Sequence, residues 1–344
     1  NENLLNLEAS IFSNLLEFLI SNSKQILHNA YILAKVDVSL SLAEIAIENN
    51  YCRPKISSRQ IFELSDSRHP VIEGILPIED SFIANDINLN SLSRQIAVIT
   101  GPNMAGKSTF LRQVALTSIM MQIGSYIPAS KATLPIIDKV YTRVGASDNL
   151  AEGESTFLVE MNEAANILNN ATRSSLILFD EVGRGTATFD GLSIAWAIVE
   201  YLHDNEKISA RTLFATHYHE LSTLENKLHR LKNFHVEVRE DNDQIVFLRK
   251  IIEGSGDKSY GIQVAKMAGL PNSIIMRAKE ILTQKFENNN ELFETLIDNN
   301  IINNIEVKDD LNLLIEDIKS LDIDELTPIE ALKILNDIKK KYIN

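Results

Sequence analysis

The sequence predicts an α/β fold in which parallel strands alternate with helices, preceded by long α-helices and followed by a helix–turn–helix and a small helical tail. Three observations lead to this fold class. Residues 1–50 carry apolar side chains at helical spacing, three short apolar runs lie between residues 96 and 215, and a glycine-rich segment follows the first run. Because a single core stops growing near roughly 250 residues, we expect a chain of 344 residues to form several domains.

The first predicted domain, residues 1–55, is helical. Its apolar residues recur every three or four positions, as they do on the buried face of a helix, beginning with Leu4, Leu7, Ile11, Leu15 and Phe18. We expect two long helices up to about Asn50, with Pro54 closing the region. Because Asn1 already stands in a helical pattern, we expect the numbering to begin inside a longer protein.

The second predicted domain, residues 56–255, begins in a loop-rich stretch and then contains the strands. The apolar runs 96–100, 176–179 and 212–215 are separated by helical stretches, which is typical of parallel strands joined by crossover helices. Residues 234–238 alternate in polarity, residues 241–243 suit a turn, and residues 245–248 continue as a strand. This pattern predicts a hairpin at the edge of the sheet.

The last third of the chain is predicted to be helical and acidic. We interpret residues 256–285 as a helix–turn–helix, because Gly269 suits a helix C-terminus and Pro271 a helix start. A linker, residues 286–305, leads to an acidic helical module, residues 306–344, in which Thr327 can cap a short helix. From residue 286 onward the chain has 14 acidic and 6 basic residues, so this tail supplies more than half of the net charge of −14.

The composition excludes several classes of protein. No run of about 18 apolar residues is present to span a bilayer, so we expect no membrane partner. The single cysteine, Cys52, excludes an internal disulfide framework and a CxxC zinc or redox site, and with no secretory leader we expect a cytoplasmic protein. The acidic balance argues against a broad basic footprint for nucleic acid.

A phosphate-binding loop follows the first apolar run. Residues 101–108 match the pattern GxxxxGK[ST] in the strand–loop–helix context that this motif requires. In such loops backbone N–H groups and a helix N-terminus converge on phosphate, while the lysine reaches the β- and γ-phosphate oxygens. The predicted nucleotide-binding residues are Gly101, Pro102, Asn103, Met104, Ala105, Gly106, Lys107, Ser108 and Thr109.

Two carboxylates follow the second apolar run. An acidic pair is usually just a solvated surface feature, but Asp180 and Glu181 stand at the carboxyl end of a strand beside the phosphate loop. There Asp180, together with the Ser108 hydroxyl, can hold Mg²⁺, and Glu181 can orient and deprotonate an attacking water. We therefore expect hydrolysis as well as binding.

His217 closes the third run and would lie at the same sheet edge, where it could sense a γ-phosphate. A lone histidine is more often packed or exposed than functional, and the residues alone leave both interpretations open. With His219 it could be mistaken for a metal pair, but the sequence offers no cysteine or third well-spaced ligand for zinc.

The chain resembles the MutS family of mismatch repair ATPases, which belongs to the ABC-type ATPases. The resemblance runs through residues 67–71, 100–109, 141–146, 155–161, 180–191, 214–217 and 258–261, and GPNMAGKST and DEVGRGTATFDG are its most specific segments. It implies an α/β P-loop ATPase of the ABC type that uses ATP, ADP and Mg²⁺.

The resemblance also implies further site residues. Ser155 would contact the nucleotide held by a partner subunit. Phe82 and His235 would flank the adenine ring, although core packing explains Phe82 equally well without the family.

The partners implied are a second copy of the chain, through the ATPase and helix–turn–helix regions, and a MutL-type repair protein. Mismatched double-stranded DNA would be bound through N-terminal domains and a clamp that this sequence does not contain, and the tail could support a tetramer. Two other enzymes remain as alternatives: a MutS relative acting in ribosome rescue or recombination, and an ABC transporter ATPase, which would need an LSGGQ-like signature that the sequence lacks. An assembly module with an inactive loop would have lost Lys107 or Glu181, and both are present.

Overall fold

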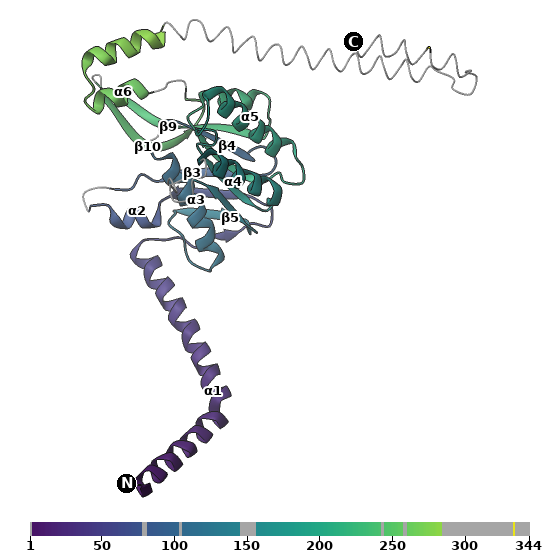
Figure 1. Ribbon diagram of the computed structural model, residues 1–344, viewed down its shortest axis with the longest axis vertical. Helices are drawn as coiled ribbons and strands as arrows, with labels where there is room; N and C mark the ends of the chain where they lie inside the picture. The colour runs from purple at the N-terminus through teal and green to yellow at the C-terminus, as the bar shows by residue number, and fades with distance from the viewer. Residues whose placement is uncertain are drawn as a thin grey trace. The chain divides into compact units, whose positions relative to one another are not determined.

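The computed structural model describes residues 2–77, 81–102, 105–144, 156–241, 244–256, 260–283 and 333. The chain divides into two compact units, Asn1–Gly261 and Ile262–Asn344. The first unit contains both β-sheets and the predicted phosphate loop, and Figure 1 labels several of its helices and strands. None of the described helices combines the length and apolarity needed to cross a membrane.

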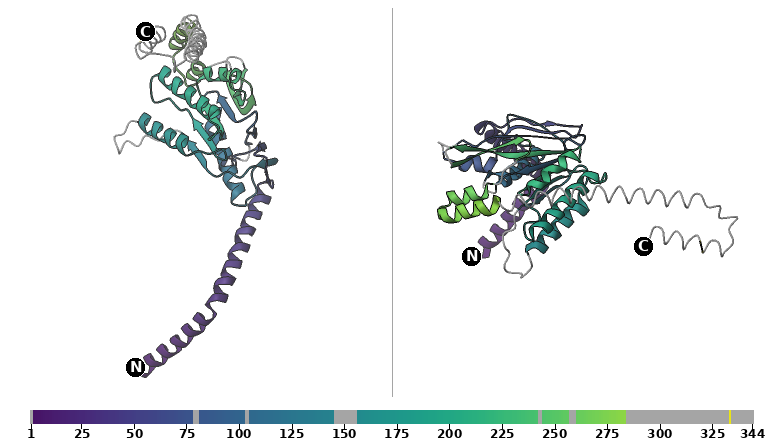
Figure 2. Two further views of the ribbon diagram at one scale, coloured as in Figure 1. Left: turned by 90° about the vertical axis from the view of Figure 1, so that its right-hand side faces the viewer. Right: turned by 90° about the horizontal axis from the view of Figure 1, so that it is seen from above.

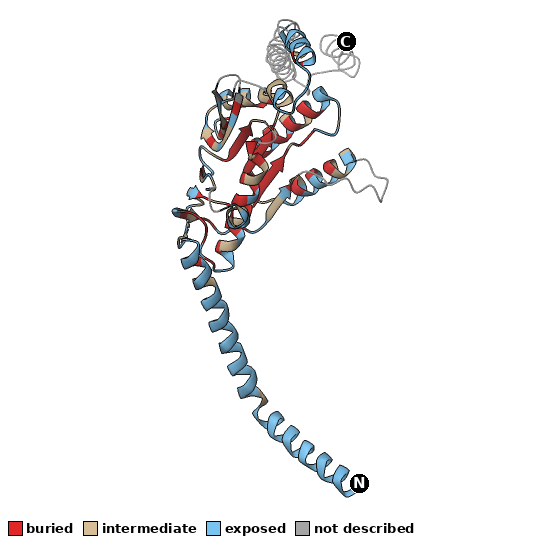
Figure 3. Ribbon diagram, turned by 90° about the vertical axis from the view of Figure 1, so that its left-hand side faces the viewer, coloured by how far each residue is buried: buried red, intermediate tan, exposed pale blue. Residues whose placement is uncertain are grey.

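One helix, α1 (Glu2–Glu48, 47 residues), replaces the two helices predicted for residues 1–50. The prediction was wrong because the polar stretch Ser21, Asn22 and Ser23 does not end the helix. These side chains instead donate hydrogen bonds of 2.7–2.8 Å to carbonyl groups of the preceding turn. The helix is exposed along almost its whole length (Figure 3), and its buried residue is Ala46.

A four-stranded sheet follows α1. Its order is β1 (Lys55–Ile56), β5 (Lys131–Leu134), β2 (Phe62–Ser67) and β3 (Asn85–Leu89). Between β2 and β3 lies α2 (Pro70–Ile75), which starts with Pro70 at its first turn and is capped by His69. Arg68 attaches the end of α1 to this region, because its guanidinium donates to the carbonyls of Asn49 and Asn50 at 3.0 and 3.1 Å.

The second sheet has six strands and confirms the predicted α/β fold. Its order is β10 (Gln244–Glu253), β9 (Leu231–Asp241), β4 (Ile96–Thr100), β8 (Arg211–Thr216), β7 (Leu176–Asp180) and β6 (Val140–Arg143). All neighbouring strands are parallel except β9 and β10, which form the predicted antiparallel hairpin at the edge. Every residue of β4, β7 and β8 is buried, which explains why these strands have continuous apolar runs.

The crossover helices are α3 (Lys107–Gln122), α4 (Thr156–Asn170) and α5 (Thr188–Asp204), and a 3₁₀ segment, η2 (His219–Asn226), follows β8. Figure 2 shows α4 and α5 together on one side of the strands. The helix α3 packs against β7 and β8, and its buried residues Phe110, Leu111 and Val114 join a core that includes residues of both sheets. This core fixes the start of α3 relative to the ends of the central strands.

The second unit begins in α6 (Gly261–Met267), which is followed by a helix at residues 272–283. Gly269 between them has a φ of +86°, a conformation that glycine adopts without strain. The predicted linker and acidic module, residues 286–344, lie outside the described residues except for Lys333.

Candidate functional site

The predicted phosphate loop connects β4 to α3. β4 ends at Thr100, Gly101 and Gly106 have φ values of +142° and +100°, and α3 begins at Lys107. The N–H groups of the first helical turn have no partner within a helix, and a helix N-terminus attracts anions. The loop therefore has the geometry expected of a phosphate cradle, although Asn103 and Met104 lie outside the described residues.

Lys107 is buried, with only 1% of its surface exposed, and its Nζ donates a hydrogen bond to the carbonyl of Gly101. Burial lowers the pKa of Lys107, while the nearby carboxylates of Glu181 and Asp180 oppose this shift. A buried ammonium group held against the loop can neutralise phosphate charge with little screening by water.

Asp180 ends β7 and is 6% exposed. Burial raises its pKa, a hydrogen bond with the Ser108 side chain lowers it, and the neighbouring Glu181 raises it again. Among the described residues its Oδ1 has no hydrogen-bond partner. A buried carboxylate beside a hydroxyl, with an oxygen left unpaired, matches the oxygen ligands that Mg²⁺ prefers, so Ser108 and Asp180 fit the predicted metal site.

Glu181 directly follows β7 with a φ of +55°, which is unusual for a residue other than glycine. Its N–H donates to the carbonyl of Ala215 on β8 at 2.9 Å, and its carboxylate pairs with Arg184. The side chain remains 17% exposed. Such backbone strain recurs at functional sites.

His217 follows β8 and completes the cluster. Burial lowers its pKa, and the negative charge of Glu181 acts in the opposite direction. Its Nδ1 is buried without a hydrogen-bond partner among the described residues, and its ring lies 4.2 Å from the ring of Tyr218. The structure thus brings Lys107, Asp180, Glu181 and His217 together at the carboxyl ends of β4, β7 and β8.

A cavity of about 440 Å³ lies beside the phosphate loop, and Phe82, Gly106, Thr109 and Arg249 are among its lining residues. Sequence reasoning missed Arg249. It stands in β10, where the pairing with β9 shifts register, and has a φ of +54°. Asn85 holds this irregular segment, since its Nδ2 donates to the carbonyl of Arg249 at 3.1 Å and its Oδ1 accepts from the N–H of Ile251 at 2.7 Å.

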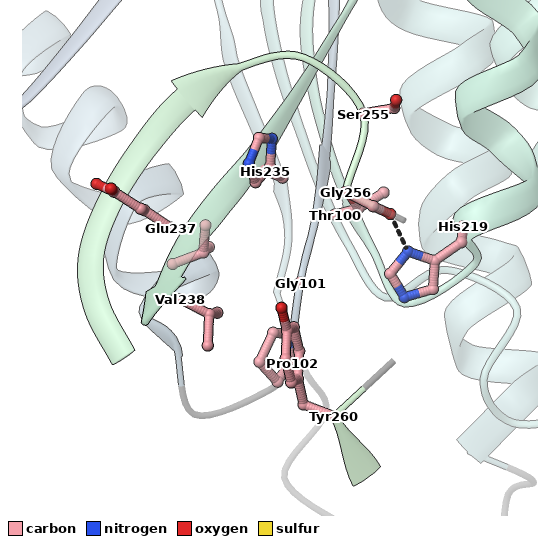
Figure 4. A pocket seen from close by; sticks show the side chains of 11 residues that line it. Thr100, Gly101, Pro102, His219, His235, Glu237, Val238, Ser255, Gly256 and Tyr260 are labelled. Atoms are coloured by element: carbon pink, nitrogen blue, oxygen red, sulfur yellow. Dashed lines mark hydrogen bonds between the residues drawn. The ribbon is translucent and has the colours of Figure 1, made fainter. Parts of the chain in front are cut away.

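His235 lines a different cavity, of about 380 Å³, together with Gly101, Pro102 and Tyr260 (Figure 4). Its Nδ1 lies 3.0 Å from the carbonyl of Gly254. Phe82 and His235 thus line two separate cavities, both of which border the phosphate loop, and their placement beside the adenine ring remains a prediction. His235, on β9, lines its cavity with Gly101 and Pro102 at the start of the loop, whereas Arg249, on β10, lines the other cavity with Gly106 at the end of the loop. Ser155 lies outside the described residues.

Comparison of the amino-acid sequence with known proteins identifies relatives of this chain. The family model of MutS domain V matches residues 97–286. The DNA mismatch repair protein MutS of Bacteroides thetaiotaomicron is 50% identical over 349 residues, covering 98% of this chain and 40% of that protein. The proteins of the same name from Salinibacter ruber and Finegoldia magna are 55% and 47% identical, covering 82% and 98% of this chain and 31% and 39% of their own lengths. The chain thus spans about 40% or less of these relatives.

Proposed function

Because the chain belongs to the MutS family and comprises its ATPase domain, we propose that it is the ATP-hydrolysing motor of a DNA mismatch repair protein. In this proposal the motor couples its nucleotide state to DNA binding and clamp release by a dimer. The observation that carries the proposal is the convergence of Lys107, Asp180, Glu181 and His217 at one edge of the six-stranded sheet.

The phosphates of ATP lie in the loop of residues 101–109. The N-terminus of α3 and the buried Lys107 would supply positive charge to them, and the Ser108 hydroxyl and Asp180 would hold Mg²⁺. When bound, Mg²⁺ would neutralise part of the charge of the β- and γ-phosphates. The unpaired Oδ1 of Asp180 supports this assignment, because a buried carboxylate oxygen without a partner is costly unless it has a ligand.

Glu181 is the residue that orients the attacking water and accepts its proton. Its position at the strand end, close enough to Lys107 and His217 to shift both of their pKa values, supports this role. His217, kept neutral by burial, contacts the γ-phosphate through its ring N–H.

The adenine base occupies the cavity lined by Phe82 and Arg249. An aromatic ring and a guanidinium group both stack on planar bases, and Gly106 and Thr109 of the loop region border the same cavity. The family resemblance also places His235 beside the base, and His235 lines a second cavity that borders Gly101 and Pro102 of the same loop.

A second copy of the chain completes the site, with its Ser155 reaching the nucleotide held by the first copy. The dimer contacts lie in the ATPase region and in the helices around residues 261–283. The proposal also includes the partners and location that the family resemblance implies: mismatched double-stranded DNA, a MutL-type protein, tetramer formation through the tail and a cytoplasmic location. The names of the relatives, DNA mismatch repair protein MutS, support the repair role alone.

The experiment that tests the proposal is steady-state ATP hydrolysis by the chain over a concentration series, with Glu181→Gln beside it. The matched control is Glu206→Gln, which makes the same change on a side chain that is 87% exposed. We expect turnover per chain to rise with concentration, to disappear in Glu181→Gln and to persist in Glu206→Gln. Turnover that survives in Glu181→Gln would refute its role, and turnover independent of concentration would remove the second copy from the site.

A further inference from the structure

The peptide group of Gly183, two residues after Glu181, is held from both sides by buried side chains. Its N–H donates to Glu160 Oε1 at 2.5 Å, and its carbonyl accepts from the Tyr218 hydroxyl at 3.0 Å. Glu160 comes from the second turn of α4, and Tyr218 follows His217 after β8. Two elements distant in sequence therefore fix one peptide in the segment that carries Glu181.

This segment has little room to shift. Gly183 has a φ of +91°, and a Cβ there would lie 2.5 Å from the carbonyl oxygen of Gly191 in α5. A Cβ on Gly191 would in turn overlap the Tyr218 hydroxyl. Contacts this short do not occur between real atoms of these kinds, so the segment, α5 and Tyr218 are packed as closely as backbone allows.

The two holding side chains are themselves fixed. Glu160 is 5% exposed, and its Oε2 pairs at 3.4 Å with Arg143 on β6, which also pairs with the partly exposed Glu163 at 3.0 Å. Tyr218 is 3% exposed, and burial together with the negative charge of Glu160 raises its pKa, so it remains a hydrogen-bond donor at neutral pH. Buried and paired in this way, neither group can turn away without leaving an unsatisfied partner.

We propose that Glu160 and Tyr218 are positioning residues that hold the segment after β7 so that the Glu181 carboxylate faces the phosphate loop. This inference rests on the proposed role of Glu181. The hydrogen bond from the Glu181 N–H to the Ala215 carbonyl fixes the backbone before the Glu181 side chain. The two hydrogen bonds of the Gly183 peptide group, to Glu160 and Tyr218, fix the backbone after it. The Tyr218 hydroxyl thus holds the segment that carries Glu181, and the Tyr218 ring lies against the ring of His217, the residue assigned to the γ-phosphate.

The test compares ATP hydrolysis and ADP affinity in Tyr218→Phe, Glu160→Gln and the control Glu163→Gln, all in the full chain. Tyr218→Phe removes one oxygen atom, and Glu160→Gln keeps the shape but places an amide N–H₂ against Arg143 or Gly183, both of which are donors. Glu163→Gln removes an equal charge beside the same arginine, on a side chain that is 49% exposed. We expect kcat to fall about tenfold in the first two variants, with KM and the Kd for ADP within about twofold, and to stay unchanged in the control.

Two further measurements separate positioning from stability. In a Glu181→Gln background, in which we expect no turnover, Tyr218→Phe should change the Kd for ADP less than about twofold, because the group that it positions acts on the attacking water and does not hold ADP. Unfolding followed by circular dichroism shows whether each variant is folded, and Tyr218→Phe decides the question if Glu160→Gln does not fold.

The inference is overturned if Tyr218→Phe has the kcat of the unmodified chain. It is also overturned if kcat and ADP affinity both fall in Tyr218→Phe or Glu160→Gln, or if Glu163→Gln loses as much kcat as those two variants do. Those results leave the proposed function standing as long as Glu181→Gln is inactive. Absence of hydrolysis in the unmodified chain would instead refute the proposed function itself.

Discussion

Replacing Gly183 by alanine should destabilise the chain by more than its small size suggests. Two costs add at this position. An L-residue other than glycine at a φ of +91° costs about 1–2 kcal/mol, and the new Cβ would lie 2.5 Å from the Gly191 carbonyl oxygen, where overpacking adds about 1–3 kcal/mol. We therefore expect Gly183→Ala to lower the free energy of unfolding by about 2–5 kcal/mol.

Gly124 provides a matched control. It follows α3 with a φ of +89°, almost the same as that of Gly183, but a Cβ there would meet no atom within 4 Å. Gly124→Ala therefore carries the backbone cost alone, about 1–2 kcal/mol. The difference in free energy of unfolding between the two variants therefore measures the contribution of the close packing between Gly183 and α5.

Urea unfolding and thermal melting of the full chain, followed by circular dichroism, measure both variants. With about 2–4 °C per kcal/mol for a domain of roughly this size, Gly124→Ala should lower Tm by about 2–8 °C and Gly183→Ala by clearly more. Equal losses in the two variants would show that α5 yields to the added methyl group, and the close packing inferred around Gly183 would be refuted.

Three other predictions follow from the charges and cavities. Burial lowers the pKa of His69 from its ordinary value of 6.5, so below pH 6.5 the unfolded chain binds a proton that the folded chain does not. The stability from this group is therefore fully present above pH 6.5 and falls as the pH drops below it. Urea unfolding from pH 7.5 to 5.5 should show this loss, with a flatter slope in His69→Asn. Asp180→Asn should raise stability by about 1 kcal/mol without nucleotide, because it removes a buried charge whose pKa burial has raised, and should abolish Mg²⁺-dependent hydrolysis; unchanged hydrolysis would exclude Asp180 as a metal ligand. Arg249→Ala should weaken ADP binding about fivefold in isothermal titration while kcat changes less than about twofold, and unchanged affinity would remove Arg249 from the base subsite.

The sequence predicted those parts of the candidate site that depend on local sequence patterns and on the rule that parallel strands end at a common edge of a sheet. The three central strands were recognisable because both of their faces are buried, which makes their apolar runs continuous. Since parallel strands end at a common edge, the residues after two of those runs, Asp180, Glu181 and His217, could be placed together with Lys107 from the amino-acid sequence alone.

Other parts depend on contacts that leave no local pattern. The strands β2 and β5 pair although more than 60 residues separate them, and Glu160 and Gly183 are 23 residues apart. Arg249 reaches its cavity through a register shift in β10, which alternation of polarity cannot reveal. The single helix α1 was missed for a related reason, because polar residues that usually end helices here bond back to their own helix.

The buried charges of the site connect its affinity to the stability of the fold. Lys107 and Asp180 both have pKa values shifted towards their neutral forms by burial, and Asp180 Oδ1 and His217 Nδ1 lack partners among the described residues. Well-packed apolar residues at these positions would be more favourable for folding alone. Phosphate, metal ion and water can together pair with Lys107, Asp180 and His217, so the binding of these groups stabilises the folded chain at this edge of the sheet. Under the proposed function, these residues bind nucleotide, so the strand ends are the part of the domain whose stability depends most on nucleotide, as a nucleotide-controlled switch requires.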